Sequence, residues 1–124
     1  MSEARSLQIV FPGDTNHLGT LFGGTLMAWM DRAAYLAATR RARGTCVTRK
    51  VDEIEFRTAI VSGDFVEMIG RVESVGRTSL VVLVEVYREM PADGARELCT
   101  TGRFTMVHVG DDSKPSPVPA ELES

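Results

Sequence analysis

The sequence lacks the features that mark several large classes of protein. Its 124 residues include only two cysteines, Cys46 and Cys99, too few and too far apart for a disulfide framework or a zinc site. No apolar run approaches the roughly 20 residues of a membrane-spanning helix. The 14 basic and 17 acidic side chains nearly balance, so the chain as a whole does not attract nucleic acid or an anionic membrane. We therefore expect no metal, no nucleic-acid partner and no membrane association.

Length and composition indicate one globular domain followed by a flexible tail. With 44% hydrophobic and 25% charged residues, the chain can build one core but not two. The segment after Gly110 is rich in Asp, Ser and Pro and does not suit a helix or a sheet ladder. This pattern predicts a domain over residues 1–110 and a tail over residues 111–124. Because the first residues lack the apolar stretch of a signal peptide, we expect a cytoplasmic protein with reduced, buried thiols.

The longest regular pattern predicts a helix from Gly24 to about Arg43. This stretch has no internal glycine or proline and consists mostly of residue types that favour helices. Arginines in its last turn suit the helix dipole, and Gly44 supplies a C-terminal stop. Apolar residues occupy most of its circumference, so the helix is expected to be buried rather than to lie on the outside of a sheet.

The rest of the domain is predicted to form strands. A short strand over residues 5–11 precedes the helix, and four follow it, over residues 46–56, 65–75, 79–88 and 98–109. Turn-forming residues separate the later strands, so consecutive strands are antiparallel. The order β-α-β-β-β-β predicts an α+β fold in which a curved antiparallel sheet wraps around one central helix.

Asp31 is the most informative polar residue of the predicted helix. Its neighbours three, four and seven positions away are Gly24, Met27, Ala28, Ala34, Tyr35 and Ala38, none of them basic. A carboxylate on such an apolar stripe is costly to bury without a partner. Two interpretations stay open: Asp31 is a functional acid, or it contacts a polar group from another strand or subunit and is structural.

The Gly23-Gly24 pair opens this helix, either as a plain turn or as an anion site. Backbone N–H groups at a helix start stabilise an anion, which in acyl transfer is the tetrahedral oxyanion. Asp31 lies seven residues beyond Gly24, about 10 Å along the axis, so it does not easily serve a group at its own helix start. Two helices packed side by side in a dimer would bring one chain's Asp31 to the other's Gly24.

Further polar residues each have two interpretations. Asn16 either holds a water or a carbonyl through its amide, or forms an Asx turn. His17 is either a base near neutral pH or a solvated loop residue. A basic cluster either receives the phosphates of a nucleotide-bearing ligand or offsets the negative end of the helix dipole. Its members are Arg40, Arg41, Arg43, Arg49 and Lys50.

A long motif before and within the predicted helix resembles the acyl-CoA thioesterase family typified by bacterial YciA and mammalian cytosolic acyl-CoA hydrolases. The motif reads Pro12-x-Asp14-Thr15-Asn16-His17-Leu18-Gly19-Thr20-Leu21-Phe22-Gly23-Gly24-x-Leu26-Met27-x-Trp29-Met30-Asp31. The resemblance continues through Val47-Thr48-x-x-Val51-Asp52-x-Ile54-x-Phe56, Val61-x-Gly63-Asp64 and Gly76-Arg77-Thr78-Ser79, and covers roughly residues 8–109. This motif is specific, because composition alone would not combine a loop asparagine, a Gly-Gly helix start and an acid seven residues later.

This resemblance implies a hotdog fold, a homodimer as the minimum unit and often a trimer of dimers, and hydrolysis of acyl-CoA. It implies that Asp31 acts as general base or nucleophile, that Asn16 orients water or the carbonyl, and that N–H groups near Gly24 bind the oxyanion. It implies no metal or redox cofactor, since coenzyme A is part of the substrate. The residues expected to contact the substrate or its CoA portion are Gly23, Gly76, Arg77, Thr78, Ser79, Arg49 and Lys50.

Three positions depart from the family pattern. Arg49 and Lys50 stand where small residues are more usual, and Arg32 stands where an acidic or apolar residue is common.

Two other functions stay open. A hotdog dehydratase of 3-hydroxyacyl thioesters would use His17 and Asp31 as an acid–base pair. The central helix of such dehydratases tends to open with Pro-Gly, whereas this helix opens with Gly23-Gly24. The non-enzymatic alternative is a module that binds acyl-CoA without turnover.

Overall fold

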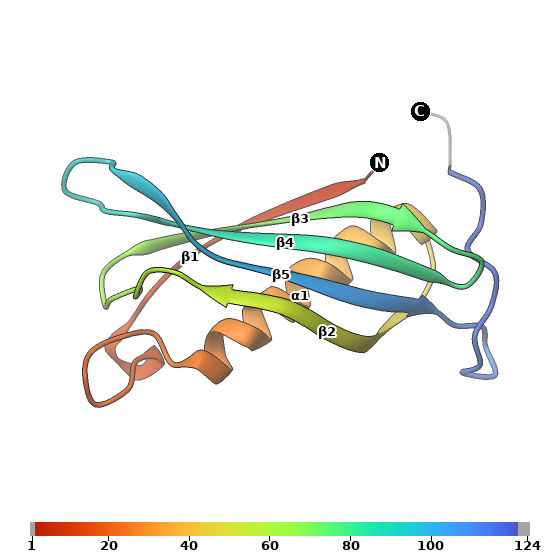
Figure 1. Cartoon of the computed structure of the whole chain (residues 1–124), viewed down its shortest axis with the longest axis horizontal. Coiled ribbons are helices and arrows are strands. Elements are labelled where there is room, and N and C mark those ends of the chain that lie inside the picture. Colours follow the sequence, from red (N-terminus) through yellow and green to blue (C-terminus); the bar gives the residue numbers. More distant parts are fainter. Residues whose placement is uncertain (1, 122–124) are drawn as a thin grey trace.

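The computed structural model describes residues 2–121, in which one long helix lies along a curved five-stranded sheet (Figure 1). The elements are β1 (Glu3–Ile9), a 3-10 turn η1 (Pro12–Asp14), α1 (Gly23–Ala42), β2 (Cys46–Phe56), β3 (Phe65–Val75), β4 (Ser79–Glu89) and β5 (Arg96–His108). The strand order is β1-β3-β4-β5-β2, and every neighbouring pair is antiparallel. The predicted α+β class, element order and wrapped antiparallel sheet are confirmed.

The helix ends differently from the sequence prediction. Arg43, and not Gly44, takes the left-handed conformation after the last turn (φ 53°, ψ 36°), and its N–H donates to the Thr39 carbonyl at 2.7 Å. Gly44 instead provides space, because a Cβ there would lie 2.5 Å from Nε2 of His108. A side chain at position 44 would therefore displace the His108 ring, a contact that a local capping pattern does not reveal.

One side of α1 packs closely on β3. Gly70 makes this possible, because a Cβ at that position would lie 2.7 Å from the carbonyl oxygen of Ala33. The helix residues buried in the core are Leu26, Trp29, Met30, Ala33, Ala34, Ala37, Ala38 and Ala42. Small side chains along this stripe let the helix backbone lie close to the sheet.

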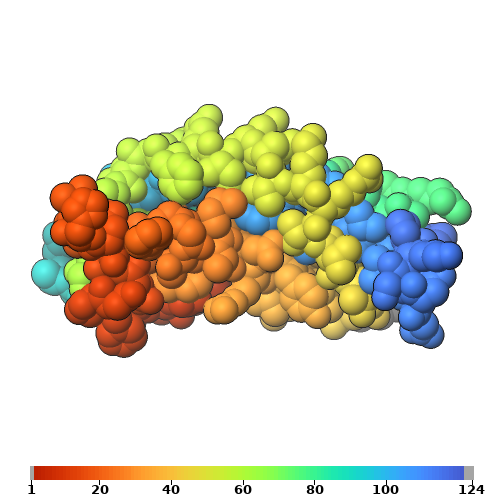
Figure 2. All heavy atoms as spheres, turned by 90° about the horizontal axis from the view of Figure 1, so that it is seen from below, coloured from red at the N-terminus to blue at the C-terminus, as the bar shows by residue number. Residues whose placement is uncertain are grey.

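The opposite side of α1 is not covered within one chain, so the single sheet buries only part of the apolar circumference of the helix. Tyr35 and Leu36 are 44% and 43% exposed, and Ala28 and Arg32 are also exposed. Figure 2 shows this open face, where the orange helix lies beside the yellow edge strand β2. The thin sheet covers only one side of the helix.

The segment that the sequence predicts to be a flexible tail runs back along the body. The Ser116 N–H donates to the His108 carbonyl at 2.8 Å, and the Val118 N–H donates to the Arg77 carbonyl at 2.8 Å. Val118 also packs against the core. Residues 122–124 of this tail lie outside the described residues, and its flexibility stays a prediction.

Two further expectations concern the cysteines and the membrane. Cys46 and Cys99 are both free and buried, as predicted, and burial raises the pKa of each thiol. Within residues 2–121, no helix has the length and apolar character required to cross a membrane.

Charged side chains form ion-pair networks between neighbouring strands. Arg71 on β3 bonds Glu3 on β1, with Nε 2.9 Å from Oε2, and also pairs with Glu85 on β4. Arg5 also bonds Glu3, at 3.0 Å, and the bonds from Arg71 and Arg5 lower the pKa of Glu3 below its ordinary value. These pairs join β1 to β3 and β3 to β4.

Candidate active site

Asp31 lies in the third turn of α1 and meets a hydroxyl from β2. The Thr48 hydroxyl donates a hydrogen bond to Oδ1 of Asp31 at 2.5 Å. A register shift between Thr48 and Lys50 makes a bulge at Arg49, and such bulges re-aim neighbouring side chains. Asp31, on the helix, therefore has a polar partner on a strand of the same chain. Thr48 was not among the predicted site residues, although it belongs to the motif that begins at Val47.

Asn16 forms the Asx turn that was one of its two interpretations. Its Oδ1 accepts hydrogen bonds from the N–H groups of Leu18 at 2.9 Å and Thr20 at 3.2 Å. These bonds orient the amide, because the acceptor oxygen faces the backbone and the Nδ2 donor faces away. Within residues 2–121 no partner is assigned to Nδ2. The turn therefore leaves the amide donor available, so the two interpretations of Asn16 are compatible.

The start of α1 is open to a ligand. No side chain of the described residues caps it, and its first intrahelical bond runs from the Leu26 N–H to the Phe22 carbonyl at 3.0 Å. A Cβ at Gly23 would meet nothing within 4 Å, and one at Gly24 would only touch the Phe22 ring at 4.0 Å. Uncapped N–H groups facing open space suit an anion or an oxyanion.

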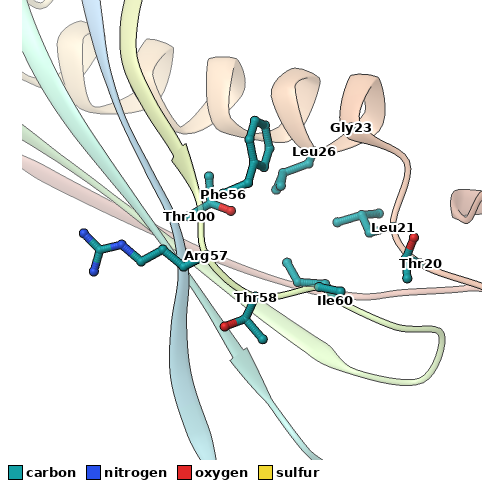
Figure 3. A pocket seen from close by; sticks show the side chains of 10 residues that line it. Thr20, Leu21, Gly23, Leu26, Phe56, Arg57, Thr58, Ile60 and Thr100 are labelled. Atoms are coloured by element: carbon teal, nitrogen blue, oxygen red, sulfur yellow. The ribbon is translucent and has the colours of Figure 1, made fainter.

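A pocket of about 280 Å³ lies beside this helix start, between α1 and the connection from β2 to β3 (Figure 3). Its lining residues are Thr20, Leu21, Gly23, Leu26, Phe56, Arg57, Thr58, Ala59, Ile60 and Thr100. Arg57 points away from the cavity in Figure 3, so the lining side chains are mainly apolar. No local sequence pattern predicts this pocket, because its residues come from three separate stretches of the chain, 20–26, 56–60 and 100.

A buried ion pair holds the wall of this pocket in place. Asp64 is 4% exposed, and its Oδ2 lies 3.0 Å from Nε of Arg88 on β4. The same Oδ2 accepts the Val61 N–H at 2.9 Å, and Arg88 also donates to the Ala59 carbonyl at 3.1 Å. The connection from β2 to β3 is thereby tied to the sheet at two backbone positions.

The structure places the predicted CoA-contacting turn far from this helix start. Gly76-Arg77-Thr78-Ser79 connects β3 to β4 at the right of Figure 1, whereas α1 begins at the left. The 20-residue helix is about 30 Å long, so one chain does not bring the two regions together. Arg77 is exposed, with its side chain available to a ligand.

The predicted basic cluster divides among different partners. Arg40 donates to the Glu3 carbonyl and Arg41 to the Pro119 carbonyl, each at 2.8 Å. Arg49 and Lys50 are exposed on β2, where Lys50 pairs with an aspartate two residues later. Arg40 and Arg41 thus hold chain segments in place, while Arg49 and Lys50 remain open to a ligand.

His17 is exposed in the loop before α1. Residues 2–121 contain no group of three or more His, Cys, Asp or Glu side chains that could hold a metal ion.

A single helix on a curved five-stranded antiparallel sheet is the hotdog fold. The profile of the thioesterase superfamily matches residues 18–95, which is more than half of the chain. The chain belongs to the thioesterase superfamily.

Bacterial relatives align with most of this chain. The acyl-CoA thioester hydrolase YkhA of Bacillus subtilis, itself uncharacterized, is 41% identical over 89% of this chain. The chain spans 64% of that protein's length, just under two thirds. The acyl-CoA thioester hydrolase YciA of Salmonella typhimurium is 34% identical over 91% of this chain and 87% of its own.

Solved structures with the same fold are also similar in sequence. A hexameric acyl-CoA thioesterase has a TM-score of 0.92 and 39% identity, covering 98% of this chain and 79% of that one. The acyl-CoA hydrolase of Staphylococcus aureus, solved with butyryl-CoA and CoA, has a TM-score of 0.90 and 32% identity, covering 98% and 74%. The S. aureus enzyme has also been solved with an asparagine, an aspartate or a threonine replaced by alanine.

Proposed function

We propose that the protein hydrolyses acyl-CoA thioesters to free CoA and a carboxylic acid, at active sites shared between two copies of the chain. The observation that carries this proposal is the hydrogen bond from Thr48 to Asp31 beside the open face of α1. It supplies an oriented carboxylate on a surface that one chain leaves uncovered. A cytoplasmic location, as the sequence predicts, belongs to the same proposal.

Residue spacing supports the choice of site residues. In the S. aureus acyl-CoA hydrolase, the replaced aspartate follows the asparagine by 15 positions, and the threonine follows the aspartate by 17. Asn16, Asp31 and Thr48 have the same two spacings in this chain. We infer that these three side chains form the polar centre of the site.

Each group has a role that its environment permits. Asp31 takes a proton from water as that water attacks the carbonyl carbon, or it attacks the carbon itself and gives a mixed anhydride. Thr48 fixes the carboxylate, and the Asn16 amide donor orients the water or the carbonyl. The N–H groups at Gly24 stabilise the oxyanion before the carbon–sulfur bond breaks and CoA leaves as the thiol. No metal or redox cofactor is needed for these steps.

A two-fold pairing of the exposed helix faces would complete the site. If two α1 helices pack antiparallel, Asp31 of one chain lies opposite Gly24 of the other when the axis passes near Ala28. Ala28 is exposed, and small residues at a crossing point allow close helix contact. We therefore propose a homodimer as the minimum unit and a trimer of dimers as the assembly, which agrees with the hexameric state of one structural neighbour.

The same pairing accounts for the distant CoA turn. With this axis the antiparallel partner helix runs past this chain's helix start, so the partner's β3–β4 turn lies at the same end of the dimer as the site. We propose that Gly76, Arg77, Thr78 and Ser79 then contact the CoA portion, together with Arg49 and Lys50. Guanidinium and ammonium groups suit the phosphates of CoA.

Release of free thiol from acyl-CoA, followed with a thiol reagent, tests the proposed function. The proposal predicts CoA release from several acyl-CoA esters at a rate proportional to protein concentration. A 3-hydroxyacyl-CoA dehydratase would instead form or consume an enoyl-CoA without releasing thiol. Binding of acyl-CoA with neither reaction would identify a non-catalytic module, and either result would overturn the proposal.

A further inference from the structure

The pocket beside the helix start contains an unsatisfied hydroxyl. Thr100 is 1% exposed, lines the pocket and has no hydrogen-bond partner for Oγ1 among the described residues. Its strand position is fixed from both sides, because β5 pairs it with Phe56 on β2 and Val86 on β4. Buried hydroxyls in proteins are nearly always hydrogen-bonded, so this one calls for a partner that enters the pocket.

The pocket suits the acyl portion of a thioester better than the CoA portion. Leu21, Leu26, Phe56 and Ile60 give it apolar walls, which disfavour a phosphate-bearing group. Gly23 also lines it, so a thioester carbonyl at the helix start would direct its acyl group into the cavity. The volume of about 280 Å³ is roughly nine times the ~30 Å³ share of one water molecule, which suits a short acyl group.

We propose that this pocket selects acyl groups that carry a hydroxyl, and that Thr100 recognises this oxygen. The inference rests on the proposed hydrolysis of acyl-CoA and adds its substrate class. An unsubstituted acyl chain leaves the Thr100 hydroxyl unpaired, whereas a hydroxyacyl group supplies it with a hydrogen-bond partner.

The test compares kcat/KM for esters of equal chain length, namely butyryl-CoA, 3-hydroxybutyryl-CoA and 4-hydroxybutyryl-CoA. We expect Thr100→Val to lower the ratio of hydroxybutyryl to butyryl kcat/KM about 10-fold for at least one hydroxy ester, the effect of a lost hydrogen bond to a buried group. Comparing this ratio between the variant and the unmodified protein cancels the intrinsic reactivity of each ester. Thr100→Ser keeps the hydroxyl and should keep the ratio.

Two controls separate recognition from damage to the fold. Thr100→Val removes an unpaired buried hydroxyl at nearly constant volume, so its Tm should be equal to or above that of the unmodified protein. Thr101→Val, the next residue on the same strand, should leave the ratio unchanged. A ratio that is the same in Thr100→Val and the unmodified protein would overturn the inference while leaving acyl-CoA hydrolysis intact. Absence of CoA release from all three esters would overturn the proposed function and this inference together.

Discussion

The hydroxyl of Thr48 donates to the carboxylate of Asp31 across the junction between β2 and α1, at 2.5 Å. Asp31 is half-buried, and Thr48 lies on the edge strand of the sheet. The contact therefore orients the acid at the face where a second chain can pack. This residue pair links the fold to the proposed chemistry.

Thr48→Val should lower kcat about 10-fold, because the carboxylate loses the hydrogen bond that orients it. Thr48→Ser keeps the hydroxyl and should restore most of the rate. Steady-state kinetics with one acyl-CoA, together with circular dichroism of each variant, checks this expectation. Equal activity of Thr48→Val and the unmodified protein would show that Thr48 does not position the acid.

Arg77→Ala should raise KM for acyl-CoA while changing KM for an acyl-pantetheine much less. The reason is that only CoA brings the nucleotide phosphates that a guanidinium can pair with. Because the Arg77 side chain is exposed, we expect Arg77→Ala to leave the stability of the fold unchanged. Equal increases of KM for both substrates would contradict a phosphate-binding role.

Glu3 should make a pH-dependent contribution to stability. The bonds from Arg71 and then from Arg5 lower its pKa below the ordinary value of 4.5, so the folded state holds the ionised form more strongly. This contribution is present above pH 4.5 and is lost as pH falls through the folded-state pKa. The Tm difference between the unmodified protein and Glu3→Gln should thus shrink towards zero in acid. This Tm difference should also shrink at high salt, because Glu3, Arg71 and Arg5 are partly exposed to solvent and salt screens their charges.

Mixing Asp31→Asn with Asn16→Ala should restore part of the activity that each variant lacks. In a mixed dimer with shared sites, one site receives both intact groups while the other receives neither. Subunit exchange is first verified with differently tagged chains. Failure to recover activity despite exchange would show that Asp31 and Asn16 of one site come from the same chain.

The sequence predicted the elements better than the contacts between them. The bounds of β2 and β3 agree with the predicted ranges, because local alternation and turn residues determine them. The bond between Asp31 and Thr48 joins the helix to β2 next to a bulge at Arg49, and no local pattern indicates either feature. The unpaired hydroxyl of Thr100 likewise appears only when β5, α1 and the β2–β3 connection enclose the same cavity.

The rate of CoA release by Asp31→Asn tests the central claim most directly. The substitution is nearly isosteric but removes the ionised carboxylate that either route of attack requires. We expect kcat to fall on the order of 10²- to 10⁴-fold, with the oligomer and acyl-CoA binding retained. A variant that releases CoA at the rate of the unmodified protein would contradict the assignment of Asp31 as the catalytic carboxylate.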